Sequence, residues 1–240
     1  MLIMTSQLRS LRILRLQAGS LLLCLALSLF HLQWGFSQKS SETPSPLRFE
    51  DEIKAMEESD QKSFPAPGGI LFVGSSSIRL WKSLAEDFPN LPVLNRGFGG
   101  ALIGEVLYYS ERIILPYQPR LIVLYIGGND VAQGIPPEKI LATFRTLTDK
   151  IHARLPQTRL LYISINPSIA RWHLDAQNRQ TDERIGSYIA RSDWIGFINA
   201  RPKMLGANGQ PRPDLWISDN LHLNETGYRL WKEILTPYLK

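Results

Sequence analysis

Short apolar runs alternate with longer amphipathic stretches along most of the chain. Most of the runs are rich in Ile, Leu or Val, which is typical of strands buried on both faces of a sheet. This alternation predicts an α/β protein: a three-layer α/β/α sandwich around a five-stranded, mostly parallel sheet. The expected strands are Ile70–Val73, Val93–Asn95, Leu121–Ile126, Leu160–Ile165 and Ile195–Asn199. The expected helices are Ile78–Phe88, Ala101–Leu115, Pro137–Leu155, Asp175–Arg191 and Glu225–Leu239.

The first 37 residues follow a different pattern. Three arginines and no acid precede residues 18–30, a run of thirteen residues without a charge. A membrane-spanning helix needs about 20 apolar residues, whereas the core of a signal peptide needs about 7–15. Small residues at 35 and 37 then provide a cleavage site. We expect residues 1–37 to be a signal peptide and the protein to be exported, either periplasmic or secreted. The alternative is an N-terminal membrane anchor, because further apolar residues extend the run to residue 36.

Residues 38–69 precede the expected domain. The segment 37–46 is rich in Ser, Pro and Thr and is interpreted as an exposed linker. Arg48–Asp60 places two apolar residues among many acidic ones, which predicts an amphipathic helix packed on the body. Residues 70–240 then form the single α/β domain.

Charge and cysteine content narrow the range of functions. The chain has 27 Lys and Arg against 22 Asp and Glu, and removing the three arginines of the leader leaves 24 against 22. Phosphate binding needs clustered, uncompensated cations, so nucleic acid is not an expected partner. The single cysteine, Cys24, lies in the leader. This excludes disulfides, thiolate metal sites and a cysteine nucleophile from residues 38–240.

A serine-rich turn follows the first expected strand. Gly74-Ser75-Ser76-Ser77 runs into a helix, whose N-terminal amides favour negative charge. A serine held there is suited to act as an acyl-transfer nucleophile, although serine is also a common helix cap. The G-x-S-x-G nucleophile elbow is not formed, because Ile78 occupies its last position.

Glycines and an asparagine follow the next two strands. Gly97–Gly100 resembles part of the dinucleotide fingerprint G-x-G-x-x-G, but Leu102 stands at the third glycine position. This segment is either a tight turn or a bare backbone amide that could face an oxyanion. Gly127-Gly128-Asn129-Asp130 is either a turn or the source of a side-chain amide that could donate to a developing negative oxygen.

The histidines provide the candidate bases. His222 follows Asp219 by three residues, close enough for the carboxylate to orient the imidazole as a triad acid does, although the same spacing suits a solvated cap. His152 is expected to face solvent. The loop after the fourth strand contains Arg171, Trp172 and His173, which are candidate substrate contacts, although Trp172 could equally be a core residue. The His-Glu-x-x-His spacing of zinc enzymes is missing from the sequence, so a catalytic metal is not expected.

Taken in order, the four motifs resemble those of the SGNH, or GDSL-like, hydrolases. These are Gly-x-Ser after the first strand, Gly after the second, Gly-x-Asn-Asp after the third and Asp-x-x-His before the last helix. The resemblance covers Ile70–Lys240 and implies the flavodoxin-like SGNH hydrolase fold. The segments 73–81, 95–100 and 211–215 are similar to those of a bacterial subgroup whose members are often exported.

The resemblance implies a role for each motif. Ser76 is the implied nucleophile, His222 the general base and Asp219 the acid that orients it. The implied oxyanion hole consists of the backbone N–H groups of Ser76 and Gly100 and the side-chain amide of Asn129.

One position departs from the family pattern. Ser75 stands where the family usually has Asp, which is not the triad acid. The spacing from Gly74 selects Ser76 among the three adjacent serines.

The implied activity is that of a serine esterase that works through an acyl-enzyme and needs no cofactor. The polar character of residues 166–173 favours a small-molecule or glycan ester, with short acyl groups on a carbohydrate or other polar alcohol. One alternative is a lysophospholipase, thioesterase or arylesterase for longer acyl chains, which would need a sizeable apolar groove. The other is a non-catalytic binding module on the same fold. A membrane is an expected partner only if the leader is retained.

Overall fold

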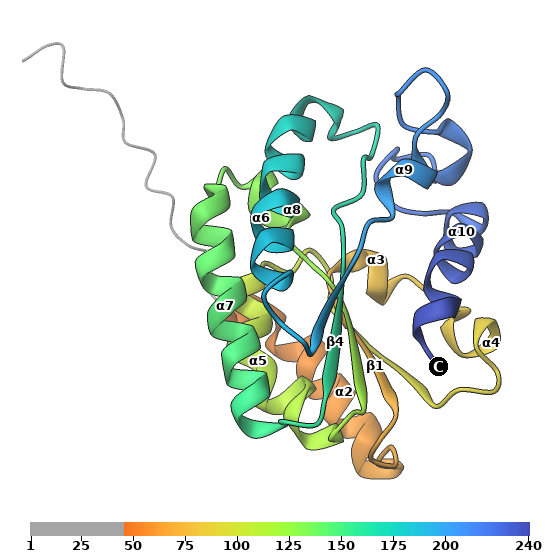
Figure 1. Cartoon of the computed structure of the whole chain (residues 1–240). Coiled ribbons are helices and arrows are strands. Elements are labelled where there is room, and N and C mark those ends of the chain that lie inside the picture. The colour runs from red at the N-terminus through yellow and green to blue at the C-terminus, as the bar shows by residue number, and fades with distance from the viewer. Residues whose placement is uncertain (1–45) are drawn as a thin grey trace, which may run out of the picture. The chain divides into compact units, whose positions relative to one another are not determined.

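A parallel sheet of five strands organises the described part of the chain, residues 46–240 of the computed structural model (Figure 1). The strand order is β2-β1-β3-β4-β5, and every neighbouring pair is parallel. The predicted α/β sandwich with a five-stranded sheet is therefore confirmed, and the sheet is parallel throughout. The strands are β1 (Ile70–Gly74), β2 (Val93–Gly97), β3 (Leu121–Tyr125), β4 (Arg159–Ile163) and β5 (Ile195–Ile198).

Helices cover both faces of the sheet, with α5, α7 and α8 on one side and α3, α4 and α10 on the other (Figure 1). The α-helices are α2 (Glu50–Lys62), α3 (Ser76–Arg79), α4 (Leu84–Asp87), α5 (Ile103–Ile113), α6 (Gly128–Ala132), α7 (Pro137–Arg154), α8 (Asp175–Ile189), α9 (Arg201–Met204) and α10 (Glu225–Leu235). Single 3₁₀ turns are η1 (Pro46–Phe49), η2 (Leu115–Tyr117), η3 (Trp172–Leu174), η4 (Pro213–Leu215) and η5 (Thr236–Tyr238).

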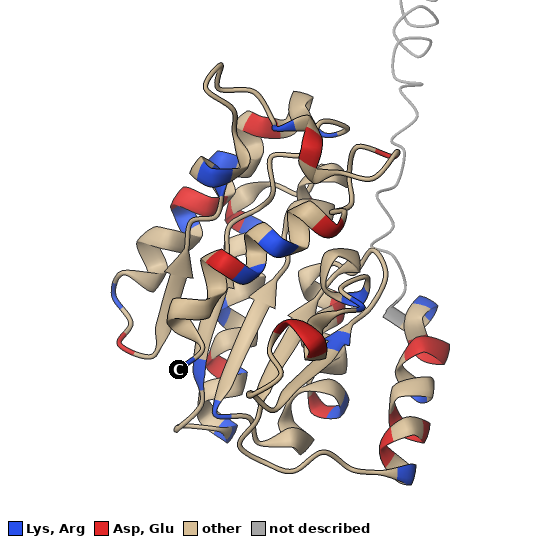
Figure 2. Ribbon diagram, turned by 90° about the vertical axis from the view of Figure 1, so that its right-hand side faces the viewer, with Lys and Arg blue, Asp and Glu red and all other residues tan. Residues whose placement is uncertain are grey.

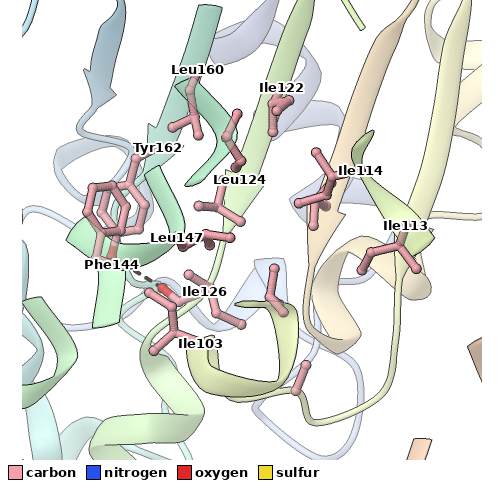
Figure 3. Packing of buried hydrophobic residues seen from close by; sticks show 14 of the residues in the cluster. Ile103, Ile113, Ile114, Ile122, Leu124, Ile126, Phe144, Leu147, Leu160 and Tyr162 are labelled. Carbon is pink, nitrogen blue, oxygen red and sulfur yellow. Dashed lines mark hydrogen bonds between the residues drawn. The ribbon is translucent and has the colours of Figure 1, made fainter. Parts of the chain in front are cut away.

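Alternate strand residues feed two separate hydrophobic cores. Leu124 and Tyr162 belong to the core beneath α5 and α7, whereas Val123 and Leu161 belong to the core beneath α10. In the first core Phe144 of α7 packs edge-on against Tyr162, with 5.4 Å between the ring centroids (Figure 3). The strands are therefore buried on both faces, as their apolar composition predicted.

The register brings the predicted motifs to one edge of the sheet. Gly74 at the end of β1 lies opposite Gly97 of β2 and Tyr125 of β3. Because these strands run in one direction and end level with one another, the loops that follow them open side by side. This is the edge at which parallel α/β sheets place their ligands.

The predicted N-terminal helix is present as α2 and packs against α5. Arg112 of α5 contacts Glu50 and Glu57 of α2 at 2.8 and 2.6 Å, while Ile53 is fully buried. Acidic and basic segments are interspersed along the helices (Figure 2), in line with the near-neutral composition of this part of the chain. None of the helices within residues 46–240 has the length and apolar character needed to cross a bilayer. The expected leader and linker lie outside the described residues.

The stretch Ile78–Phe88 is not the single helix that the sequence predicted. It is divided into α3 and α4, and the chain turns at Trp81. The indole N–H of Trp81 donates to Asp87 at 2.7 Å, and its ring stacks on Tyr228 of α10 with 5.2 Å between centroids. Burying this ring against α10 stabilises the structure more than a continuous helix would. The periodicity of the sequence does not predict such packing between distant segments.

Candidate active site

Ser76 begins helix α3 directly after β1. Gly74 has a φ of 147°, and a Cβ at this position would lie 2.0 Å from the carbonyl oxygen of Tyr125, so only glycine fits. Ser75 and Ser77 are buried at 6% and 5% exposure, whereas Ser76 is partly exposed. The turn therefore presents Ser76, among the three adjacent serines, at the open edge of the sheet.

His222 bridges Ser76 and Asp219. Its Nε2 lies 2.9 Å from Ser76 Oγ, and its Nδ1 lies 2.6 Å from Asp219 Oδ2. The other carboxylate oxygen of Asp219 accepts the backbone N–H groups of Leu221 and His222 at 2.9 and 3.0 Å. Desolvation raises the pKa of Asp219, but these hydrogen bonds outweigh it, so the pKa lies below its ordinary value. The carboxylate is thus held ionised and fixed in orientation.

The second acidic candidate, Asp214, points elsewhere. It is exposed and pairs with Arg212 at 2.6 Å, and this hydrogen bond keeps its pKa below the usual range. The backbone carbonyl of Asp214 accepts the side-chain amide of Asn224, which also caps α10 by accepting from Gly227 N at 3.0 Å. Asp214 therefore lies in the segment that positions the start of α10, away from His222.

Gly100 and Asn129 line the same opening. Gly100 has a φ of 72°, and nothing lies within 4 Å of the position its Cβ would take. Asn129 lies in the first turn of α6, where its Nδ2 donates to Ala101 O at 3.0 Å and its Oδ1 accepts from Arg171 at 2.9 Å. Because Arg171 fixes which end of the amide carries the oxygen, one N–H of Asn129 remains for a ligand.

These residues surround one cavity of about 390 Å³. Its volume falls within the range of small-molecule sites. Among the residues that line the cavity, only Tyr125, Ile165 and Leu221 have mainly apolar side chains. The others are glycines or have polar or charged side chains. The lining residues are Glu52, Ser75, Ser76, Ser77, Arg79, Gly99, Gly100, Tyr125, Gly128, Asn129, Ile165, Asn166, Ser168, Arg171, Asn178, Leu221 and His222.

Comparison with known proteins identifies the family. The model of the GDSL-like lipase/acylhydrolase family matches residues 72–230. The chain belongs to this family. It is a carboxylic ester hydrolase.

The relatives of this acylhydrolase are esterases and proteins of the same fold. The GDSL esterase/lipase WDL1 of Oryza sativa subsp. japonica is 28% identical over 213 aligned positions, which cover 73% of this chain and 80% of that protein. A solved structure described as a platelet activating factor from Streptococcus pneumoniae matches with a TM-score of 0.73 and 19% identity. The match covers 90% of this chain and 99% of that chain. Axe2, an acetylxylan esterase from Geobacillus stearothermophilus, matches with a TM-score of 0.59 and 13% identity over 72% and 95%.

Only one of the three predicted substrate contacts in the loop after β4 lies at the cavity. Arg171 lines the cavity of the acylhydrolase, whereas Trp172 and His173 do not. The guanidinium of Arg201 lies over the ring of Trp172 at 5.5 Å, and His173 is exposed. His152, which was expected to face solvent, is exposed and stacks on Trp194.

Several cavity residues were not predicted as site residues, among them the polar or charged Glu52, Arg79, Asn166 and Asn178. Asn166 comes shortly after β4, as Asn129 comes after β3, and this strand-end position was the available signal. Glu52 accepts the backbone N–H of Gly99 at 3.2 Å across 47 residues of chain, a long-range contact without a local signal.

Two buried carboxyl groups support the loops around the site. Asp130 accepts the N–H of Ile103, and Asp182 accepts the N–H of Ile165 at 3.0 Å. Burial is the main cause that raises the pKa of each to about 7. Asp130 thus joins α6, the short helix after β3, to the start of α5, and Asp182 joins the loop after β4 to α8. Among the side chains of residues 46–240, the structure contains no group of three or more His, Asp or Glu that could hold a metal ion.

Proposed function

We propose that this acylhydrolase cleaves its ester by two-step acyl transfer at Ser76. The observation that carries the proposal is the position of His222 between Ser76 Oγ, at 2.9 Å, and Asp219, at 2.6 Å. Both distances are within the reach required of a nucleophile, its general base and the group that orients the base.

In the first step Ser76 Oγ attacks the ester carbonyl carbon while His222 Nε2 takes the hydroxyl proton. The carbonyl π electrons move to oxygen, and the resulting oxyanion accepts hydrogen bonds from the N–H groups of Ser76 and Gly100 and from the amide of Asn129. Collapse of this intermediate breaks the bond to the alcohol oxygen, which leaves with the proton from His222. Water then attacks the acyl-enzyme with the same proton transfers and frees Ser76.

Asp219 holds His222 in the tautomer that this sequence requires. Its carboxylate accepts the Nδ1–H, which leaves Nε2 unprotonated and facing Ser76. The same negative charge stabilises the imidazolium that forms during attack.

The substrate is proposed to be a short acyl group on a carbohydrate or other polar alcohol. The polar and charged lining of the cavity supports this class, as does the acetylxylan esterase among the proteins of the same fold. Longer acyl chains, the substrates of a lysophospholipase or thioesterase, find less support, because only three lining residues have mainly apolar side chains. A non-catalytic binding module would not require the contact between His222 and Ser76.

We further propose that the protein is exported, with residues 1–37 as its signal peptide. The support is the arginine-flanked apolar run followed by small residues. It would then act in the periplasm or the medium, and the resemblance of segments 73–81, 95–100 and 211–215 to a bacterial subgroup with exported members also supports this proposal.

Purified full-length protein and p-nitrophenyl esters of increasing acyl length test the proposed reaction. Acetate should be the preferred acyl group, and a fluorophosphonate should label Ser76, as mapped by mass spectrometry. Ser76→Ala should abolish hydrolysis, and Ser75→Ala and Ser77→Ala, the matched controls, should retain most of it. A label on Ser75 or Ser77, or full activity in Ser76→Ala, would overturn the assignment.

A further inference from the structure

We propose that Asn166 and Asn178 form a subsite that binds hydroxyl groups of the substrate. This inference rests on the proposed esterase function and adds to it a recognition site for the polar part of the ester. Both residues line the cavity that contains Ser76 and His222. Asn166 comes from the loop after β4, and Asn178 lies in α8.

Both asparagines are buried, and three of their side-chain polar atoms lack hydrogen-bond partners. Asn166 is 5% exposed and Asn178 is 4% exposed. Oδ1 and Nδ2 of Asn166 and Oδ1 of Asn178 have no partner within the described part of the chain. Buried polar atoms are normally paired, because leaving them unpaired costs stability. The other two such atoms among residues 46–240 are the indole nitrogens of Trp216 and Trp231, which do not line this cavity.

Hydrogen bonds from neighbouring segments fix the positions of Asn166 and Asn178. The N–H of Asn166 donates to Tyr125 OH at 3.3 Å, and its carbonyl accepts from Ser168 N at 2.9 Å. Asp182 binds the backbone of Ile165, the residue before Asn166. Since Asn178 lies one turn before Asp182 on α8, the same carboxyl group brings helix and loop together. The backbone contacts thus fix the positions of the two residues, while Oδ1 and Nδ2 of Asn166 and Oδ1 of Asn178 stay unpaired.

The subsite is also tied to the segment that carries His222. Ala170 N, in the Asn166 loop, donates to Asn220 O at 3.0 Å, and Asn220 lies between Asp219 and His222. A ligand group held by the asparagines would therefore sit in a fixed relation to the reacting atoms. Holding the substrate in a fixed position relative to the reacting groups increases the rate of the reaction.

The chemistry of the unpaired atoms selects the ligand. Two carboxamide oxygens accept hydrogen bonds, and the Asn166 nitrogen donates, so the matching group must both donate and accept. A sugar hydroxyl does both. A hydrocarbon chain would leave these atoms unpaired, and sites built to hydrogen-bond a hydroxyl strongly reject analogues that lack it. An anion would face two carboxamide oxygens that offer it no proton.

Two acetate esters of similar shape test the subsite. One is 6-O-acetylglucose, and the other is cyclohexylmethyl acetate, which lacks the ring oxygen and the hydroxyl groups. We expect Asn166→Leu and Asn178→Leu each to lower kcat/KM for the sugar ester by about tenfold or more. The hydroxyl-free ester should change by less than about threefold, because it makes no hydrogen bond to lose. Gln180→Leu, on the exposed side of α8, is the matched control and should affect neither ester. If Asn166→Leu does not fold, as judged by circular dichroism, Asn166→Ala removes the amide without adding bulk.

Direct binding separates failure of the subsite from failure of the proposed reaction. Calorimetry or ligand-observed NMR would measure binding of 6-O-acetylglucose to Ser76→Ala, with and without Asn166→Leu. Binding that Asn166→Leu abolishes supports the subsite even if the wild-type protein hydrolyses neither ester, in which case the proposed reaction fails alone. Hydrolysis of both esters, with equal losses or no loss in the asparagine variants, overturns the subsite and leaves the esterase proposal standing. The subsite is likewise overturned if Ser76→Ala does not bind the sugar ester.

Discussion

Asp219→Asn should lower kcat/KM for p-nitrophenyl acetate by about 10³–10⁴-fold, and more severely than Asp219→Ala. The reason lies in the two roles of the carboxylate. Oδ1 accepts two backbone N–H groups, and Oδ2 accepts from His222 Nδ1. An asparagine must keep its oxygen toward the two backbone donors. Its NH₂ group then lies where Oδ2 was and donates to His222 Nδ1. That forces the proton onto Nε2, which faces Ser76 and can no longer accept its proton.

The size of each loss follows from what is removed. The wrong tautomer and the loss of charge together correspond to about 4–5 kcal/mol of transition-state stabilisation. Asp219→Ala removes the hydrogen bond to the imidazolium but imposes no tautomer, because water can reach a side chain that is 42% exposed. A hydrogen bond to a charged group contributes about 1.5–3 kcal/mol, so the alanine variant should lose about 10–10²-fold. Asp214→Asn breaks an exposed pair with Arg212 and should change activity less than about threefold.

Initial rates on p-nitrophenyl acetate, with folding checked by circular dichroism and thermal melting, would measure the three variants. The expected order of damage is Asp219→Asn, then Asp219→Ala, then Asp214→Asn. The reasoning is wrong if a folded Asp214→Asn variant is the most impaired. It is also wrong if Asp219→Asn retains more activity than Asp219→Ala.

Three further outcomes are expected. Arg171→Ala should reduce kcat by about 10²-fold with little change in KM, because it removes one of the two hydrogen bonds that orient the amide of Asn129, a proposed oxyanion donor. Steady-state kinetics that show only a KM effect would contradict this. The melting temperature of Asp182→Asn, relative to that of the wild type, should rise progressively from about pH 4 to about pH 8. The wild-type carboxyl has a pKa of about 7 in the folded state and about 3.9 in the unfolded state. It therefore stabilises the fold fully only below about pH 4 and loses that contribution as the pH rises through about 7. A pH-independent difference in melting temperature would refute that account. N-terminal sequencing of the exported protein should find cleavage close to residue 37, whereas an intact N-terminus in the membrane fraction would indicate an anchor instead.

The parts of the site that sequence could predict are those set by strand ends and short spacings. Parallel strands that end level bring the loops after Gly74, Gly97 and Tyr125 together, so a serine, a glycine and an asparagine at those ends were expected to meet. The three-residue spacing between Asp219 and His222 is likewise local. Such features depend on backbone geometry that the residues themselves encode.

The remaining parts depend on packing between distant segments. The break at Trp81 results from burial of its ring against α10, and the cation over Trp172 comes from Arg201, beyond β5. Asn178 has the appearance of an ordinary polar helix residue, because nothing in its neighbours indicates that this turn of α8 faces the cavity. Single-chain periodicity contains no information about which helix face will meet which loop.

The contribution of α2 to the cavity has a consequence for how the enzyme is divided into parts. The family match begins at residue 72, but Glu52 lies in the cavity wall and binds the backbone beside Gly100. Helix α2 contributes no strand to the sheet and is held to α5 and β2 by side-chain contacts, Arg112 with Glu50 and Glu57 and Arg96 with Asp60. A fragment that began at Ile70, the start of β1, would keep the whole sheet and all three proposed triad residues, yet lose the part of the cavity wall that Glu52 contributes. Conversely, exchanging this one helix between relatives would redesign that wall while leaving the chemistry in place.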